Sequence, residues 1–270
     1  MAIKRETDGK DIMNIFERID AKQAAINTAN LFEGYMLEQI RNYYRVSLTW
    51  SSNALEGNSM TEIETKVLLE DDLTPHGRPL RDMFETAGHA EAYDFMFTLR
   101  GKRGFAEQDI LTLHRLFFHN TDREKAGVYR DRRVLISGSQ YPPTCPENIQ
   151  RDMDAMLEWA DTQRESCHPV EFAASLHKRF VFISPFIDGN GCVSRLLMNT
   201  ALIQDGYLPA IIPPVLRPEY IALLETARTD DRPFIEFIAE RELESQENMM
   251  RMLHIRPEQN REQAPGLTIQ

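Results

Sequence analysis

One short stretch of this chain combines residue types that can bind a phosphate group. Asp188 is followed directly by Gly189-Asn190-Gly191, and an apolar, helix-forming run continues from Arg195 to Ile203. The two glycines let the backbone turn sharply and approach a ligand closely. The first turn of the helix predicted next carries free N–H groups and a positive dipole, which favour an anion. The stretch therefore predicts a phosphate-binding loop.

Asp188 and Arg195 place charges of both signs around this loop. A carboxylate beside free backbone N–H groups can hold a divalent cation, and an arginine one turn into a helix can reach a phosphate. A plain helix–loop–helix connection uses the same glycines, so the loop alone leaves both interpretations open. It is neither a Walker loop, which ends in Gly-Lys-Ser or Gly-Lys-Thr, nor a dinucleotide fingerprint, which follows a strand.

The composition is that of an ordinary globular protein, with 42% hydrophobic and 27% charged residues among 270. No apolar run approaches the roughly 20 residues that span a bilayer, and the first residues lack the apolar stretch typical of a signal peptide. The formal net charge of −11 argues against a nucleic-acid-binding surface but not against a nucleotide site. Three widely spaced cysteines form neither a disulfide framework nor a CxxC metal site. We expect a cytoplasmic protein with no membrane or nucleic-acid partner.

Helical periodicity dominates the chain. Residues 11–46 predict one long or two consecutive amphipathic helices. Thr61 to Glu64 form a capping box that opens a short helix ending near Asp71. Further helices are predicted over residues 81–100, 106–119, 147–162, 169–183, 191–205, 217–228 and 232–254. The tail over residues 256–270, rich in Gln, Glu, Pro and Arg, is predicted to be disordered.

The exception to helix lies at residues 126–143. A β-prone run ends there in turn residues, and Pro142-Pro143 prevents its continuation. We predict a small β-hairpin or flap. Its central residues are Val134, Leu135, Ile136, Ser137 and Gly138.

A second polar stretch runs from Ser52 to Asn58, and a loop with a capping serine explains it when it is taken alone. Together with the glycine-rich loop, however, it resembles the Fic family, whose members usually transfer AMP from ATP to a protein hydroxyl. The family motif is His-x-Phe-x-Asp/Glu-Gly-Asn-Gly-Arg-x-x-Arg. The positions that match it in register are Phe186, Asp188, Gly189, Asn190, Gly191 and Arg195. Ser52-x-x-x-Glu56-Gly57 is similar to the inhibitory motif of some members.

The resemblance extends from about residue 50 to residue 245. Gly127-x-Tyr129-Arg130 and the run after it are similar to the family's flap, and residues 217–220 and 231–234 are similar to its C-terminal helices. It implies an all-α, Fic-type helical domain with one small β-hairpin flap over residues 51–255. That domain includes the inhibitory motif at 52–57 and the active-site loop at 184–195. Residues 1–50 are then a helical extension.

The resemblance also implies a role for each site residue. Asp188 would hold Mg²⁺, and Arg195 would meet the γ-phosphate of ATP. The α- and β-phosphates would be bound by the loop residues Gly189, Asn190, Gly191 and Cys192. Glu56, with Ser52, would pair with Arg195 and block the γ-phosphate. The flap would pair with an extended target segment by β-augmentation.

Two motif positions differ from the family. The motif histidine is Ser184 here, and its first arginine is Cys192. Serine cannot act as a general base at neutral pH, and such a base contributes roughly 10²–10⁴-fold. Phosphoryl-type transfer depends mainly on positioning and charge stabilisation, so we expect slow transfer rather than none. His177 is predicted to be a buried core residue, and Cys192 is not expected to act as a nucleophile although a helix N-terminus lowers a thiol pKa.

The expected function is autoinhibited, Mg-dependent transfer of AMP from ATP to a Ser, Thr or Tyr hydroxyl of a protein, including this chain itself. One alternative is a catalytically inactive nucleotide-binding protein, and another is a de-AMPylase that uses Glu56. A DNA-binding regulator is disfavoured by the net charge and by the lack of a recognition helix after residue 230. Residues 1–46 would form a homodimer or docking surface, or pack on their own core. The target protein is not predicted.

Overall fold

The computed structural model describes residues 14–136 and 139–255, and within them the fold is all-α, as predicted. No described helix is long and apolar enough to cross a membrane. After residue 60 the helices begin and end within about two residues of the predicted bounds. The helices are α1(Ile15–Thr28), α2(Gly34–Leu55), α3(Glu62–Glu70), α4(Leu80–Thr98), α5(Glu107–Phe118), α6(Ile149–Gln163), α7(Pro169–Ile183), α8(Asn190–Gln204), α9(Arg217–Thr226) and α10(Arg232–Met252).

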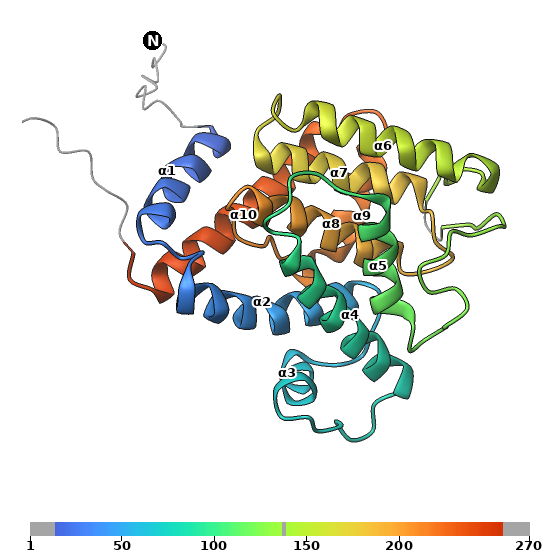
Figure 1. Cartoon of the computed structure of the whole chain (residues 1–270), viewed down its shortest axis with the longest axis horizontal. Helices are drawn as coiled ribbons and strands as arrows, with labels where there is room; N and C mark the ends of the chain where they lie inside the picture. The colour runs from blue at the N-terminus through green and yellow to red at the C-terminus, as the bar shows by residue number, and fades with distance from the viewer. Residues whose placement is uncertain (1–13, 137–138, 256–270) are drawn as a thin grey trace, which may run out of the picture.

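Helix α8 runs through the centre of the fold (Figure 1). Every residue from Cys192 to Ile203 is buried. A helix that is buried on all sides needs neighbours on all sides, and α7, α4, α5 and α2 pack against it. The first turn of α8 follows the glycine-rich loop, so the core itself holds that loop in place.

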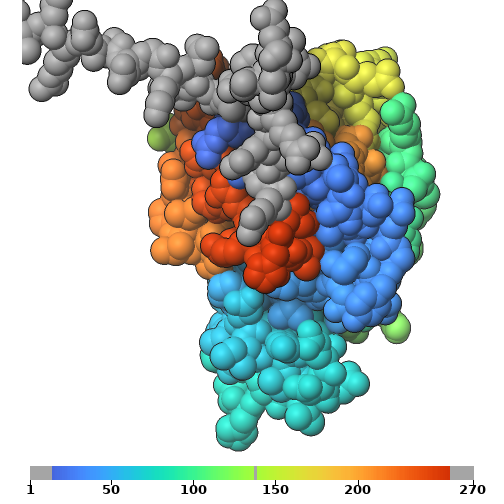
Figure 2. Space-filling model, turned by 90° about the vertical axis from the view of Figure 1, so that its left-hand side faces the viewer, coloured from blue at the N-terminus to red at the C-terminus, as the bar shows by residue number. Residues whose placement is uncertain are grey.

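The N-terminal periodicity resolves into two helices rather than one. The chain turns between α1 and α2, where Asn30 and Gly34 adopt positive φ angles of 50° and 51°. Helix α1 buries Ile19 and Ile26 and packs against α10. Figure 2 shows these blue and red segments side by side, although they lie at opposite ends of the chain.

Helix α2 continues to Leu55, well beyond the predicted end at residue 46. Ser52 therefore lies within a helix, and the prediction of a loop at this stretch was wrong. The reason is tertiary: the hydroxyl group of Ser51 donates to the Ile212 carbonyl, and the hydroxyl group of Ser52 accepts a hydrogen bond from Arg195 Nε. These buried contacts outweigh the weak helix propensity of serine and asparagine. The predicted domain boundary after residue 50 falls inside this helix and stays a prediction.

The predicted β-hairpin is not formed by the described residues of the flap. A hairpin needs two strands that exchange backbone hydrogen bonds. Here the carbonyl groups of Arg132 and Thr144 instead accept hydrogen bonds from the Arg130 guanidinium. The same guanidinium donates to the Ser184 carbonyl at 2.8 Å. Leu135 is 95% exposed. Ser137, Gly138 and the predicted disordered tail lie outside the described residues.

Candidate active site

A cavity of about 350 Å³ lies where the end of α2, the start of α8, the start of α9 and the flap meet. This volume is within the range of small-molecule sites. Its charged lining residues are Glu56, Asp188, Glu225, Arg217 and Arg228. Its apolar lining includes Ile136, Val181, Phe182, Ile187, Ile221 and Leu224. The cavity thus combines an apolar wall with a charged one.

The glycine-rich loop is closed by its own asparagine. Asn190 Oδ1 accepts a hydrogen bond from the Phe186 N–H at 2.9 Å, and Asn190 Nδ2 donates to the Phe186 carbonyl at 2.9 Å. Both polar groups of the Asn190 side chain are therefore used in hydrogen bonds within the loop, and its predicted contact with a phosphate stays a prediction. The donors left for an anion are the backbone N–H groups of Asn190, Gly191 and Cys192 in the first turn of α8, which have no hydrogen-bond partner among the described residues.

Gly191 lies directly beneath Glu56. A Cβ atom at this position would lie 2.1 Å from Glu56 Oε1, so a side chain there would displace the glutamate. Gly189 adopts φ +75°, and a Cβ atom there would lie 2.8 Å from the Phe117 ring. The two glycines are thus required for different reasons: one admits the glutamate, and the other allows the turn.

Asp188 stands at the mouth of the cavity with its side chain 58% exposed. Its Oδ1 accepts the Gly189 N–H at 2.8 Å, and its Oδ2 contacts Arg81 Nη2 at 3.2 Å. Among the described residues, no group of three or more His, Cys, Asp or Glu side chains could hold a metal ion. Mg²⁺ commonly uses one or two carboxylates together with phosphate oxygens. Asp188 therefore fits Mg²⁺ that arrives with a nucleotide, provided that Arg81 moves away.

His114 positions the carbonyl group of Asp188, a role that the sequence did not reveal. The Gly127 N–H donates to His114 Nδ1 at 2.9 Å, so the ring proton is on Nε2, which donates to the Asp188 carbonyl at 3.1 Å. The ring also stacks on Phe186 with a centroid distance of 3.7 Å. Burial lowers the pKa of His114 to about 4. Nothing in the sequence around His114 indicates that it has this role.

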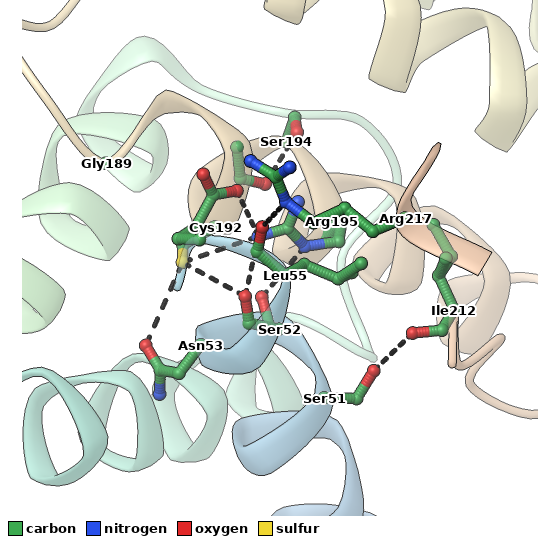
Figure 3. A network of polar contacts seen from close by, with 12 residues as sticks. Ser51, Ser52, Asn53, Leu55, Gly189, Cys192, Ser194, Arg195, Ile212 and Arg217 are labelled. Carbon is green, nitrogen blue, oxygen red and sulfur yellow. Dashed lines mark hydrogen bonds and ion pairs between the residues drawn. The ribbon is translucent and has the colours of Figure 1, made fainter. Parts of the chain in front are cut away.

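The predicted pair between Glu56 and Arg195 is present, with Arg195 Nη2 2.7 Å from Glu56 Oε1. Ser52 and Glu56 are four residues apart, which places them on one face at the end of α2. Arg195 Nε donates to Ser52 Oγ and Arg195 Nη2 donates to the Ser52 carbonyl, each at 2.9 Å (Figure 3). The Arg195 side chain is 3% exposed and the Glu56 side chain 46%. Glu56 lines the cavity and covers the arginine behind it.

The two departures from the motif are both buried. Ser184 ends α7 in the left-handed conformation, with φ 46°, and its hydroxyl donates to the Val181 carbonyl at 2.6 Å. Cys192 is fully buried, and this burial raises the pKa of its thiol to about 12. A thiol with such a pKa stays protonated at neutral pH, so Cys192 is not a nucleophile.

His177 is a buried core residue, as predicted. Its Nε2 lies 2.9 Å from the Tyr220 hydroxyl and 3.2 Å from Ser194 Oγ. The Tyr220 hydroxyl in turn accepts from Arg195 Nη1 at 3.4 Å. Burial, with a smaller contribution from Arg195, lowers the pKa of His177 to about 3. This histidine supports Arg195 from behind and does not face the cavity.

The start of the flap lines the open side of the cavity through Val134, Leu135 and Ile136. Its far end is attached to α9. The Gln140 N–H donates to Glu225 Oε2 at 3.1 Å, and the Arg228 guanidinium lies over the Tyr141 ring. The flap is thus anchored on the helix that also carries Tyr220.

We expect the stability of this protein to fall as the pH is lowered from 7 to 5. The pKa of His114 is about 4 in the folded protein and near 6.5 in the unfolded chain, so between these values only the unfolded state takes up the proton. The loss amounts to about 2 kcal/mol for this residue at pH 5. Urea unfolding at pH 7 and pH 5 measures it. His114→Gln should show a pH dependence that is weaker by about this amount, and an unchanged dependence would contradict the assignment.

Comparisons with known proteins agree with this geometry. Residues 104–202 match the model of the Fic/DOC family. A protein adenylyltransferase Fic of Drosophila willistoni is 34% identical over 225 residues, which cover 82% of this chain and 45% of that protein. The protein of the same name from Nematostella vectensis is 35% identical over 194 residues, 70% of this chain and 45% of that protein. The chain thus spans about half the length of the curated relatives it matches.

Solved structures show the same fold. Fic-1 from C. elegans superimposes with a TM-score of 0.79 at 26% identity, covering 89% of this chain and 73% of that one. A Fic domain containing signaling protein from Bacteroides thetaiotaomicron has a TM-score of 0.79 over 90% of this chain and 99% of that one, and its 24% identity bears on the fold alone. The glycine-rich loop, the cavity beside it and these matches show that the chain belongs to the Fic/DOC family.

Proposed function

We propose that this chain transfers AMP from ATP to a hydroxyl group of a protein and that Glu56 inhibits this transfer. The observation that carries the proposal is the position of Glu56, which covers Arg195 at the cavity lined by Asp188 and the first turn of α8. The curated relatives are named protein adenylyltransferase Fic. They support the reaction class for the domain that they share with this chain.

In this proposal the nucleotide phosphates lie against the free N–H groups at the start of α8. Asp188 would hold Mg²⁺, which when bound neutralises part of the phosphate charge. Arg195 would meet the γ-phosphate once Glu56 has moved away, because arginine binds phosphate oxygens with paired donors. Arg81 would release Asp188 at the same time.

The transfer itself forms one bond and breaks one. The target hydroxyl oxygen would attack the α-phosphorus, the bond from the α-phosphorus to the bridging oxygen would break, and pyrophosphate would leave. The hydroxyl proton needs an acceptor. Ser184 donates its own proton to Val181, and His177 is buried, so neither residue serves as that base. The proton would pass to solvent or to a phosphate oxygen, and the reaction would be slow.

A labelling experiment tests the proposal. The full chain is incubated with Mg²⁺ and ATP labelled at the α-phosphate, and label bound to protein is measured. Asp188→Ala should abolish labelling. Asp122→Ala is the matched control, because it also removes a partly exposed carboxylate from an ion pair, that with Lys125, but lies outside the cavity lining. Equal labelling by the Asp188→Ala variant and the control would contradict the role of Asp188.

The geometry of Ser184 favours one second candidate, a nucleotide-binding protein that does not transfer AMP. Its hydroxyl is turned toward the end of α7 and offers no proton acceptor to the cavity. ATP binding without labelling, in the wild type and in Glu56→Gly alike, would support this candidate. Removal of AMP from a modified protein through Glu56 is the third outcome. Modification of the chain by itself, a homodimer and a cytoplasmic location remain predictions.

A further inference from the structure

Arg217 is a second arginine at the Glu56 end of the cavity. It is the first residue of α9 and follows the 3-10 turn Pro214–Leu216, and Pro218 sets the start of the helix. Its Nε donates to the Leu55 carbonyl at 2.6 Å, in the last turn of α2 (Figure 3). A cation is favoured there because the carbonyl groups that end a helix carry partial negative charge. This contact holds Arg217 next to the inhibitory glutamate.

The terminal nitrogens of Arg217 are not used by the rest of the described chain. Arg217 makes no hydrogen bond or ion pair with a described residue other than the bond to Leu55, and it is exposed and lines the cavity. Arg228 also lines the cavity, but its guanidinium lies 3.7 Å from the centroid of the Phe182 ring and 5.3 Å from that of Tyr141. Arg195 is held by Ser52 and by Glu56. Arg228 makes no hydrogen bond to a described residue either, but its Nε is buried and its guanidinium lies against two rings. Arg217, in contrast, is exposed at the cavity with its terminal nitrogens unused by the described residues.

An anionic ligand in this cavity needs a further cationic partner such as Arg217. The lining has the carboxylates Glu56, Asp188 and Glu225 against the guanidiniums Arg217 and Arg228. The motif position that would carry a second phosphate-binding arginine is Cys192, which is fully buried and carries no charge. A nucleoside triphosphate brings several negative charges, so its phosphate chain needs cationic partners here.

We propose that Arg217 binds the phosphate chain of the nucleotide and supplies the guanidinium that position 192 lacks. Its Nε stays bound to Leu55, which orients the two terminal nitrogens as a planar fork. Because Leu55 directly precedes Glu56, the fork lies beside the place that the γ-phosphate takes when the glutamate leaves. The ligand class is a nucleoside di- or triphosphate, and a monophosphate would be too short to reach the fork. This inference rests on the proposed ATP site, but not on AMP transfer.

Calorimetric titration of the full chain with Mg-ATP and with AMP tests the role of Arg217. All proteins carry Glu56→Gly so that the site is open, and the variants added are Arg217→Gln, Arg217→Lys and Arg232→Gln. Arg217→Gln should weaken ATP binding about tenfold, as expected for loss of a charge-assisted hydrogen bond, and should change AMP binding less than twofold. Arg217→Lys should recover part of the loss. Arg232→Gln, which removes the charge of an exposed arginine outside the cavity lining, should leave both affinities unchanged.

Two results would overturn the inference. An unchanged affinity for ATP would show that Arg217 does not contact the phosphates. Equal losses for ATP and AMP would show that Arg217 acts only by holding α9 against α2. If Arg217→Gln fails to fold, Arg217→Lys tests the inference in its place, because lysine keeps the positive charge but its side chain reaches less far toward the phosphates. Failure of the proposed function gives a different result: ATP then binds in an Arg217-dependent way, but no label is transferred to protein.

Discussion

Replacing Ser184 by histidine should raise the rate of AMP transfer by about 10²-fold or more when Glu56 is also replaced by glycine. The substitution restores a general base at the motif position, and such a base contributes roughly 10²–10⁴-fold. The backbone at residue 184 has φ 46°, a region where histidine is among the better-tolerated residues. Ser184 already lines the cavity, so an imidazole there has space on the ligand side. The rate of label transfer from α-labelled ATP measures the gain.

Ser184→Asn is the control for this prediction, because asparagine tolerates the same backbone conformation but cannot take up the proton. The histidine variant should also acquire a pH dependence, with a rate that falls as the pH drops below about 6.5, where imidazole becomes protonated. A rate that is unchanged or equal in both variants would show that residue 184 does not stand beside the attacking hydroxyl.

Replacing Glu56 by glycine should raise both ATP affinity and labelling by about tenfold or more. Arg195 is only 3% exposed in this structure, because Glu56 lies between it and the cavity. Removing the carboxylate frees a guanidinium whose hydrogen bonds to a charged partner are worth about 1.5–3 kcal/mol each, and the γ-phosphate can then take them. Calorimetric titration with Mg-ATP and the labelling rate measure the two effects.

Two further variants separate relief of inhibition from other effects of Glu56→Gly. Glu56→Gln keeps the length of the side chain and loses its charge, so it should give an intermediate gain. Adding Arg195→Ala to Glu56→Gly should remove the gain, because the freed arginine is what the γ-phosphate binds. A gain that persists without Arg195 would contradict the pairing as the cause of inhibition.

The parts of this fold that depend on local pattern were predictable. The capping box at Thr61 and Glu64 forms as expected, and the apolar run of α8 becomes the buried centre of the molecule. The pair between Glu56 and Arg195 was also anticipated, but from the family motif rather than from chemistry, since the two residues are 139 positions apart. Nothing in either segment alone indicates that they meet.

What could not be predicted depends on contacts between distant segments. Arg81 reaches Asp188 across 107 residues, and the His114 ring supports the Asp188 carbonyl from another helix. The continuation of α2 through Ser52 depends on partners in α8 and in the chain after it. The predicted hairpin does not form because the Arg130 guanidinium donates hydrogen bonds to the carbonyl groups of Arg132 and Thr144, on either side of the flap. Such tertiary contacts override local preferences.

The central claim is that this site transfers AMP and that Glu56 restrains it. The most direct measurement uses the Glu56→Gly chain with Mg²⁺ and ATP labelled at either the α- or the γ-phosphate, followed by the mass of the intact protein. We predict that label from the α-phosphate is retained on protein with the mass of one AMP group, and that label from the γ-phosphate is not. Retention of the γ-label, or no label while ATP is bound, would contradict the account.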